Sequence, residues 1–340
     1  MTEASRSPRV QRGWAREASP FHPGEQFIQR MVGVRDQVER AGRNMIQERM
    51  PAQSRALFEA LPLIVVGSLS AEGQVWASLL SGAPGFVRSP SDNVLVVHAQ
   101  PVLGDPLANQ LQVGAPLGLL GIQLETRRRN RANGRVVARD ATSFTVQVEQ
   151  SFGNCNQYIQ ARQPTFDAAL VGTGAAPALE RAHLSDRASA LLANTDTFFI
   201  ATASASAASG SDGEGADVSH RGGRPGFVRV THSERRTTLL IPDFSGNFMF
   251  NTLGNLQANP QAGIVCADFG TGNVLSLTGT ATTLWDGPDL AAFEGAERLL
   301  EFNVQAGVFL EDALPLRFTG FSASPTLVGT GTWAEAKRSA

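Results

Sequence analysis

Gly82-Ala83-Pro84-Gly85-Phe86-Val87-Arg88 recurs as Gly223-Arg224-Pro225-Gly226-Phe227-Val228-Arg229, with six of seven positions identical and 141 residues between the copies. A match of this length rarely arises by chance in a chain of this size. Two shorter matches follow at similar spacing: Leu107-Ala108-Asn109 aligns with Leu253-Gly254-Asn255, and Gly134 aligns with Gly279. The sequence therefore indicates an internal duplication, with a small insertion in the second copy.

Length and composition limit the number of domains and the classes of partner that the chain can have. A chain of 340 residues favours two domains, and the repeat predicts them at residues 51–165 and 185–325. The net charge of −2 provides no field for recruiting nucleic acid. No apolar run approaches the length of a membrane span. We therefore expect neither nucleic acid nor membrane as a partner.

The first 50 residues precede the repeat and are predicted to be a disordered start followed by a helix. Arginines without an apolar segment fit a disordered basic tail or a transit peptide up to about Phe21, and they do not fit a secretory signal. From Gly24 to about Arg49, apolar residues recur at helical spacing. Two cysteines, Cys155 and Cys266, are too few for a disulfide framework, which favours a cytoplasmic protein with reduced thiols.

Short β-rich runs separated by Gly and Asn turns fill both copies, which predicts a mainly β fold with a small antiparallel barrel in each copy and flanking helices. Helices are expected at Ala188–Ala193 and Leu290–Phe302, and a mobile hairpin loop at Ala203–Ala216. The expected strands are Leu63–Leu69, Val94–Ala99, Leu117–Leu124, Arg135–Ala138 and Phe144–Val148 in the first copy, and Phe198–Ala203, Phe227–Val230, Thr238–Ile241, Gly263–Phe269 and Val274–Ala281 in the second.

The window from Val218 to Leu256 gathers groups that suit a phosphate. It holds closely spaced arginines, glycines that let the backbone approach a ligand, and amide and hydroxyl side chains. Every basic residue of the chain except Lys337 is an arginine, so any anion must be held by guanidinium, backbone N–H or hydroxyl groups. From composition alone, solvated arginines and turn-forming glycines explain the window equally well.

The run from Ser219 to Pro260 resembles the FMN-binding split-barrel flavoproteins related to pyridoxamine 5′-phosphate oxidase, and in particular an uncharacterised bacterial branch of that family. The first copy resembles them only through the duplication. Proteins of this kind are usually homodimers with FMN at the subunit interface, so the resemblance implies tandem split barrels packed as a pseudo-dimer within one chain. The matching positions are Ser219, Arg221, Gly222, Pro225–Val230, Leu239–Asp243, Gly246, Asn247, Thr252, Asn255, Asn259 and Pro260.

The resemblance implies a set of FMN-binding residues. Arg229 is expected at the phosphate, and Val230 and Thr231 are expected to offer backbone groups to the flavin ring. The basic residues that follow these segments in the oxidase are absent, so Arg221, Arg224 or Arg88 of the other copy would supply the missing charge. The remaining implied contacts come from Ser219, Asn251, Thr252 and Asn255.

Other residues carry weaker signals. His220 is a candidate proton donor near a flavin, and a solvent-facing turn histidine is an equal alternative. The segment Phe152–Ile159, with Cys155 and Tyr158, is read as a structural cap in preference to a flavin contact. The other histidines show no metal-ligand spacing, so no metal site is expected; they are His22, His98, His183 and His232.

The favoured function is an FMN-dependent oxidoreductase acting on a small-molecule redox substrate, with NAD(P)H as a candidate electron donor. The oxidase's substrate-binding C-terminal pattern is absent, so pyridoxamine phosphate oxidation does not transfer. Whether the protein is an enzyme stays open, because a non-catalytic flavin-binding or storage protein fits the same residues. A split barrel for haem or a deazaflavin is a further alternative, and a homodimer of pseudo-dimers is a further expectation.

Overall fold

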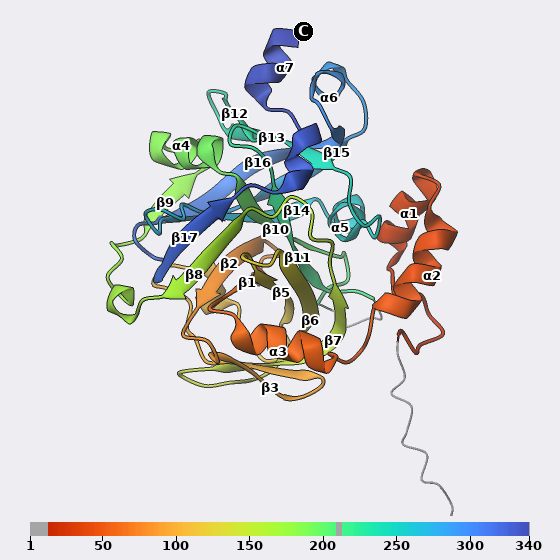
Figure 1. Ribbon diagram of the computed structural model, residues 1–340, viewed down its shortest axis with the longest axis vertical. Coiled ribbons are helices and arrows are strands. Elements are labelled where there is room, and N and C mark those ends of the chain that lie inside the picture. Colours follow the sequence, from red (N-terminus) through yellow and green to blue (C-terminus); the bar gives the residue numbers. More distant parts are fainter. Residues whose placement is uncertain (1–12, 209–212, 340) are drawn as a thin grey trace, which may run out of the picture.

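The computed structural model describes residues 13–208 and 213–339. Figure 1 shows a β-rich body with helices at its periphery. The prediction of a mainly β protein with flanking helices is confirmed. None of the described helices combines the length and the apolar character needed to cross a membrane.

The first half of the chain forms a seven-stranded antiparallel sheet in the order β2-β1-β5-β6-β7-β4-β3. Helix α3 (Ala52–Ala60) lies against it, and its core contains Ile64, Leu119 and Phe144. The strands are β1 (Leu63–Leu69), β2 (Val75–Ser81), β3 (Val87–Ser91), β4 (Val94–Val97), β5 (Pro116–Gln123), β6 (Arg128–Arg139) and β7 (Phe144–Gly153).

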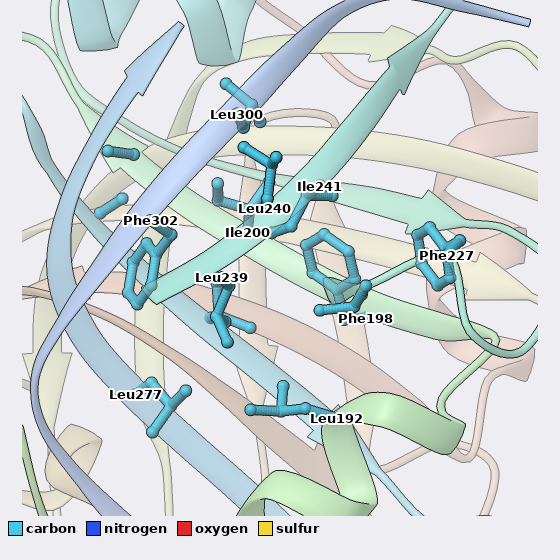
Figure 2. Close-up of a cluster of buried hydrophobic side chains, with 14 of the residues drawn as sticks. Leu192, Phe198, Ile200, Phe227, Leu239, Leu240, Ile241, Leu277, Leu300 and Phe302 are labelled. Atoms are coloured by element: carbon cyan, nitrogen blue, oxygen red, sulfur yellow. The ribbon is translucent and has the colours of Figure 1, made fainter. Parts of the chain in front are cut away.

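The second half forms a sheet with the same strand order, β11-β10-β14-β15-β16-β13-β12, to which β9 (Ala178–Arg181) adds beside β16. In Figure 2, Phe198, Leu239 and Phe302 converge in its core, together with Leu192 from helix α4 (Asp186–Asn194). The strands are β10 (Thr197–Ala203), β11 (Ala216–Gly222), β12 (Arg229–His232), β13 (Thr237–Phe244), β14 (Gln261–Ala267), β15 (Val274–Leu284) and β16 (Ala296–Leu310).

The sequence repeat has counterparts in strand register. Arg88 lies opposite Val96 in the first sheet, and Arg229 lies opposite Leu240 at the same place in the second. The register shifts next to Gly134 between β6 and β7, and next to Gly279 between β15 and β16. A Cβ atom at either glycine would lie within 2.2 Å of a carbonyl oxygen on the neighbouring strand, so both bulges require glycine.

The two halves pack closely against each other. A shared apolar cluster joins Val65 and Leu120 of the first half to Phe199 and Val265 of the second. Backbones also meet directly, because a Cβ atom on Gly118 would lie 2.7 Å from the Ala216 carbonyl oxygen. This is the contact expected of an intrachain pseudo-dimer. A two-stranded sheet of β8 (Ala161–Phe166) and β17 (Leu316–Ser322) joins the ends of the two halves.

Two helix predictions need correction. The single helix expected from Gly24 to Arg49 is two helices, α1 (Pro23–Met31) and α2 (Arg35–Met45), separated at Gly33 with a φ of 75°. The helix expected over Leu290–Phe302 is instead the short α6 (Pro288–Ala292) followed by β16, because pairing with β13 and β15 overrides local helical preference. The remaining helical segments are α5 (Asn251–Ala258), α7 (Trp333–Ser339), η1 (Pro106–Asn109), η2 (Ala168–Leu170) and η3 (Pro325–Gly329).

The N-terminal segment and the expected hairpin loop are only partly described. Residues 1–12 and 209–212 lie outside the described residues, so disorder and mobility there stay predictions. Trp14 and Phe21, within the stretch expected to be disordered, are buried in a small cluster with Phe152 and Met249. The segment before α1 is therefore packed against both halves from Trp14 onward.

Candidate functional site

A cavity of about 120 Å³ lies where the two halves meet. The first half contributes residues of β6 and the segment after β7 from Asn154 to Tyr158. The second half contributes the end of β11, the turn after β13, and the first residues of α5. Neither half encloses the cavity by itself, so the packing of the pseudo-dimer creates it.

The dominant feature of this cavity is a group of four arginines, which we call the arginine cluster. Asp243 is the one carboxylate among the described lining residues, so positive charge is in excess. The cluster consists of Arg129 and Arg131 on β6, Arg221 on β11 and Arg298 on β16.

Arg131 is the most firmly held member of the cluster. It is 2% exposed, and its guanidinium forms an ion pair with Asp217 at 3.1 Å. It also donates to the side-chain oxygen of Asn251 at 2.7 Å and to the hydroxyl of Ser219. Arg129 has no carboxylate partner among the described residues, and it donates to the Cys155 carbonyl at 2.5 Å.

The other two arginines share one carboxylate. Arg221 pairs with Asp243, and Arg298 approaches the second oxygen of the same carboxylate at 3.4 Å. Arg298 also pairs with Glu297 and lies over the rings of Phe250 and Trp285, at 5.2 and 5.3 Å. The carboxylate of Asp243 thus orients two guanidinium groups toward one space.

Several buried donors of this site have no partner. They are Nε of Arg131, Nε of Arg221 and Nη1 of Arg298, and neither ring nitrogen of the neutral His220 has a hydrogen-bond partner. Buried polar groups are nearly always hydrogen-bonded, so a concentration of such atoms at one cavity indicates a ligand that accepts hydrogen bonds.

The charges of the cluster act on one another. Burial and the neighbouring arginines lower the pKa of Arg221 to about 9, and burial lowers the pKa of Arg129 to about 10. The pKa of His220 lies well below its usual value because it is buried beside Arg129 and Arg221, so its imidazole is neutral. A bound anion would relieve this repulsion, and the site is therefore built for a negatively charged group.

Aromatic rings form the other wall of the cavity. Tyr158 packs against Phe244 with 5.2 Å between ring centroids, and Phe248 packs edge-on against Phe250 at 6.1 Å. Phe248 and Phe250 both have positive φ, 58° and 61°, which is uncommon for non-glycine residues. The segment 248–250, which we call the aromatic loop, is therefore held in a costly backbone conformation next to the arginines.

Helix α5 points its N-terminus at the cavity. Asn251, Thr252 and Leu253 line the space, and no side chain caps this helix end. Free backbone N–H groups at a helix N-terminus attract anions. The N-terminus of α5 therefore adds to the preference for anions that arises from the arginine cluster.

Five residues predicted from the sequence meet at this cavity, namely Ser219, His220, Arg221, Asn251 and Thr252. Asn255 lies behind the wall, where it donates to Thr202 at 3.0 Å and to Asp217 at 3.3 Å. The other predicted residues lie elsewhere.

The structure places Arg229 away from the arginine cluster. Its guanidinium makes two hydrogen bonds to Asp289, at 2.7 and 2.5 Å, and lies over the ring of Trp333 at 4.2 Å. The reason is its position on β12, the edge strand of the second sheet, with Val230 and the exposed Thr231. Arg224 pairs with Glu335 at 2.6 Å, and Arg88 is exposed on β3.

Sequence reasoning missed Arg129, Arg131 and Arg298. A signal for the first two was present in Arg127-Arg128-Arg129-Asn130-Arg131, because alternate residues of a strand point to one face. The segment that was read as a cap also lines the cavity, through Cys155 and Tyr158. Metal-binding geometry is not found: no group of three or more His, Cys, Asp or Glu side chains within residues 13–208 and 213–339 could hold a metal ion.

A second cavity, of about 570 Å³, occupies the corresponding place on the other side of the pseudo-dimer. It is lined by Leu79, which corresponds to His220, and by Val274, which corresponds to Arg129. Ala99 stands where the first cavity has Asp243. Its described lining contains no arginine, lysine or carboxylate, so only one of the two related cavities carries charge.

No protein-family model matches the chain, and comparison with curated proteins gave no match. Among solved structures, it is similar to HupZ of Group A Streptococcus, with 14% identity and a TM-score of 0.28, over 36% of this chain and 90% of HupZ. It is also similar to HutZ, the haem storage protein from Vibrio cholerae, with 12% identity and a TM-score of 0.22, over 42% and 95%. The inhibitor of motility MotI of Bacillus subtilis has 8% identity and a TM-score of 0.21, over 72% and 87%. These TM-scores are too low to carry an argument about the chemistry of the site.

Proposed function

We propose that the chain binds FMN in the cavity between its two halves, with the phosphate held by the arginine cluster. The observation that carries this proposal is the group of four arginines that line one cavity, with a single carboxylate among its described lining residues. A phosphate accepts several charge-assisted hydrogen bonds at once and supplies the negative charge that the cluster lacks. Ser219, Thr252 and the N-terminus of α5 offer further donors to the same group.

The aromatic wall distinguishes FMN from a bare phosphate. Tyr158, Phe244 and the aromatic loop present apolar faces beside the arginines, which suits a ligand with a charged end and a flat ring. The cavity is smaller than the roughly 300 to 1,000 Å³ of typical cofactor pockets. We therefore expect the aromatic loop to move outward when FMN enters, and Phe248, which is 41% exposed, has room to do so.

FMN supplies hydride and electron transfer chemistry when it is bound. The chain's own residues would orient the cofactor through its phosphate and provide a neutral imidazole beside it. His220 has both ring nitrogens without partners, so it can donate one hydrogen bond and accept another. We propose that it holds or passes a proton for a small redox substrate, with NAD(P)H as the candidate electron donor.

A second candidate is a haem-binding or storage role, and one observation favours it. A buried, neutral and unpartnered imidazole such as that of His220 is also a suitable ligand for haem iron. The arginine cluster would then pair with the haem propionates. Both candidates use the same cavity and the same positive charge, and they differ in the role of His220.

The visible spectrum of the purified protein after incubation with FMN or with haem separates the two candidates. We expect a flavin spectrum, quenching of FMN fluorescence on titration, and bleaching by NAD(P)H. Saturable haem binding with an intense Soret band that is lost in His220→Ala would favour the second candidate. If neither FMN nor haem binds, both candidate functions are contradicted.

A further inference from the structure

The N-terminal helix α1 is docked against α5, the helix that begins at the cavity. The contact is close: a Cβ atom on Gly24 would lie 2.2 Å from the Gly254 carbonyl oxygen, and one on Gly254 would lie 2.4 Å from Cγ of Glu25. A glycine on each helix therefore allows the two backbones to touch. This brings the side chain of Glu25, which is 3% exposed, to the first residue of α5.

Three side chains then connect α1 to the arginine cluster. The Glu25 carboxylate accepts a hydrogen bond from the side-chain amide of Asn251, and the amide oxygen of Asn251 accepts one from Arg131 at 2.7 Å. An asparagine side chain has one donor end and one acceptor end. If Asn251 were reversed, its NH2 group would face the guanidinium, so the bond from Glu25 fixes the orientation that Arg131 requires.

A second contact from α1 holds the aromatic loop. The side-chain amide of Gln29 donates to the carbonyl oxygen of Met249 at 3.0 Å, and Gln29 is completely buried. Met249 lies between Phe248 and Phe250, the two residues with positive φ. Because that conformation is costly, it needs outside support, and the bond from Gln29 of α1 provides it.

We propose that α1 is a clamp on the cavity, in which Glu25 acts through Asn251 as a positioning residue for Arg131 and couples anion affinity to its own protonation. This inference rests on the proposed function, because it concerns the same cavity. Glu25 does not line the cavity and is not proposed to touch the ligand.

The electrostatic surroundings of Glu25 set the direction of the coupling. Burial, helped by the nearby charge of Asp217 and opposed by His22 and two hydrogen bonds, raises the pKa of Glu25 to about 7. The charged and titratable groups that face it are His22, at 3.7 Å, Asp217, and Arg131 beyond Asn251. An anion bound at Arg131 adds negative charge and favours protonated Glu25, so affinity for the anion falls as pH rises through this range.

Two substitutions separate the hydrogen bond from the charge. Glu25→Gln keeps an acceptor for Asn251 and removes the charge, whereas Glu25→Ala removes both. Gln26→Ala is the matched control, because Gln26 lies on the same helix and bonds to the Phe21 carbonyl, away from α5. The probes are FMN and, separately, inorganic phosphate, titrated at pH 6 and pH 8.

We expect Glu25→Ala to weaken binding of both probes about tenfold at pH 6, through the loss of one hydrogen bond, and by less at pH 8, where the variant also lacks the unfavourable charge of Glu25. Glu25→Gln should match the wild type at pH 6 and should bind both probes about threefold to tenfold more tightly than the wild type at pH 8, a comparison in which the titration of the phosphate itself cancels. Equal pH profiles for wild type and Glu25→Gln, or equal affinities for Glu25→Ala and Gln26→Ala at pH 6, would overturn the inference.

A measurement without ligand keeps the two proposals distinguishable. The pKa of Glu25 is higher in the folded chain than its ordinary value of 4.5, so the folded state holds a proton that the unfolded state releases between these values. Thermal stability of the wild type should therefore fall relative to Glu25→Gln as pH rises from about 5 to about 8. If phosphate binds with the expected pH profile and FMN does not, the proposed cofactor fails and the clamp stands. A flat difference in stability contradicts the clamp whatever FMN does.

Discussion

At the scale of single residues, the site is defined by guanidinium groups that lack sufficient counter-charge. Arg221 and Arg298 share Asp243, Arg131 is paired with Asp217, and Arg129 donates only to backbone carbonyls among the described residues. Burial, and after it the charges of the neighbouring arginines, lowers the pKa of Arg221. The folded state keeps these guanidinium groups close together despite their mutual repulsion, and a negatively charged ligand would reduce that repulsion.

Arg129 and Arg229 provide a direct test of where the phosphate binds. Arg129→Ala should weaken FMN binding about tenfold to a hundredfold, because it removes a charge-assisted contact that no other residue compensates. Arg229→Ala should leave FMN affinity unchanged and cost a little stability, because it removes the ion pair with Asp289 and the contact with Trp333. Fluorescence titration of both variants decides between the two positions. If Arg229→Ala weakens FMN binding and Arg129→Ala does not, the phosphate binds at Arg229, as the family resemblance implies.

The resemblance led to only part of the cavity lining, because Arg229 and Arg224 lie in the same run and are paired elsewhere. Ser219, Arg221, Asn251 and Thr252 lie in the second copy, within the run that carries the resemblance, and they line the cavity. Arg131 lies in the first copy, and Glu25 lies outside both. Their roles depend on the packing of segments more than 85 residues apart in the sequence, which no local pattern encodes.

At the scale of elements, glycines set how closely strands and helices approach. Many strands were predictable from apolar runs and turns, whereas β2, β3 and β11 were not among the expected strands, and the strand expected over Phe227–Val230 begins only at Arg229. The strand β16 was not predictable, because Arg298-Leu299-Leu300 has helical character and becomes a strand only by pairing with β13 and β15. Local preference decides an element only where no stronger tertiary pairing competes.

The contact between the two halves can be tested at Gly118. Gly118→Ala places a Cβ atom 2.7 Å from the Ala216 carbonyl oxygen and should lower the free energy of unfolding by about 1 to 3 kcal/mol through overpacking. Gly329→Ala is the control, because its Cβ atom would meet nothing within 4 Å. Chemical denaturation of both variants measures the difference. Equal stabilities would mean that the backbones do not approach as closely as the structure places them.

At the scale of the whole molecule, one pseudo-dimer contains two related cavities of unequal character. Where the first cavity has Arg129, His220 and Asp243, the second has Val274, Leu79 and Ala99. An uncharged cavity cannot repay the cost of removing water from a phosphate dianion. We therefore expect the proposed anion to bind on the side of the arginine cluster only.

This asymmetry predicts one FMN per chain, although the fold has two related places for it. Titration of a known protein concentration should saturate at one equivalent, and Arg129→Ala should weaken all of the binding and not half of it. Val274→Ala alters the corresponding position of the second cavity and should leave stoichiometry and affinity unchanged. Saturation at two equivalents, or a residual unaffected half in Arg129→Ala, would show that the uncharged cavity also binds the cofactor. In that case the arginine cluster would not be the feature that selects the ligand, because the same anion would bind where every corresponding arginine is missing.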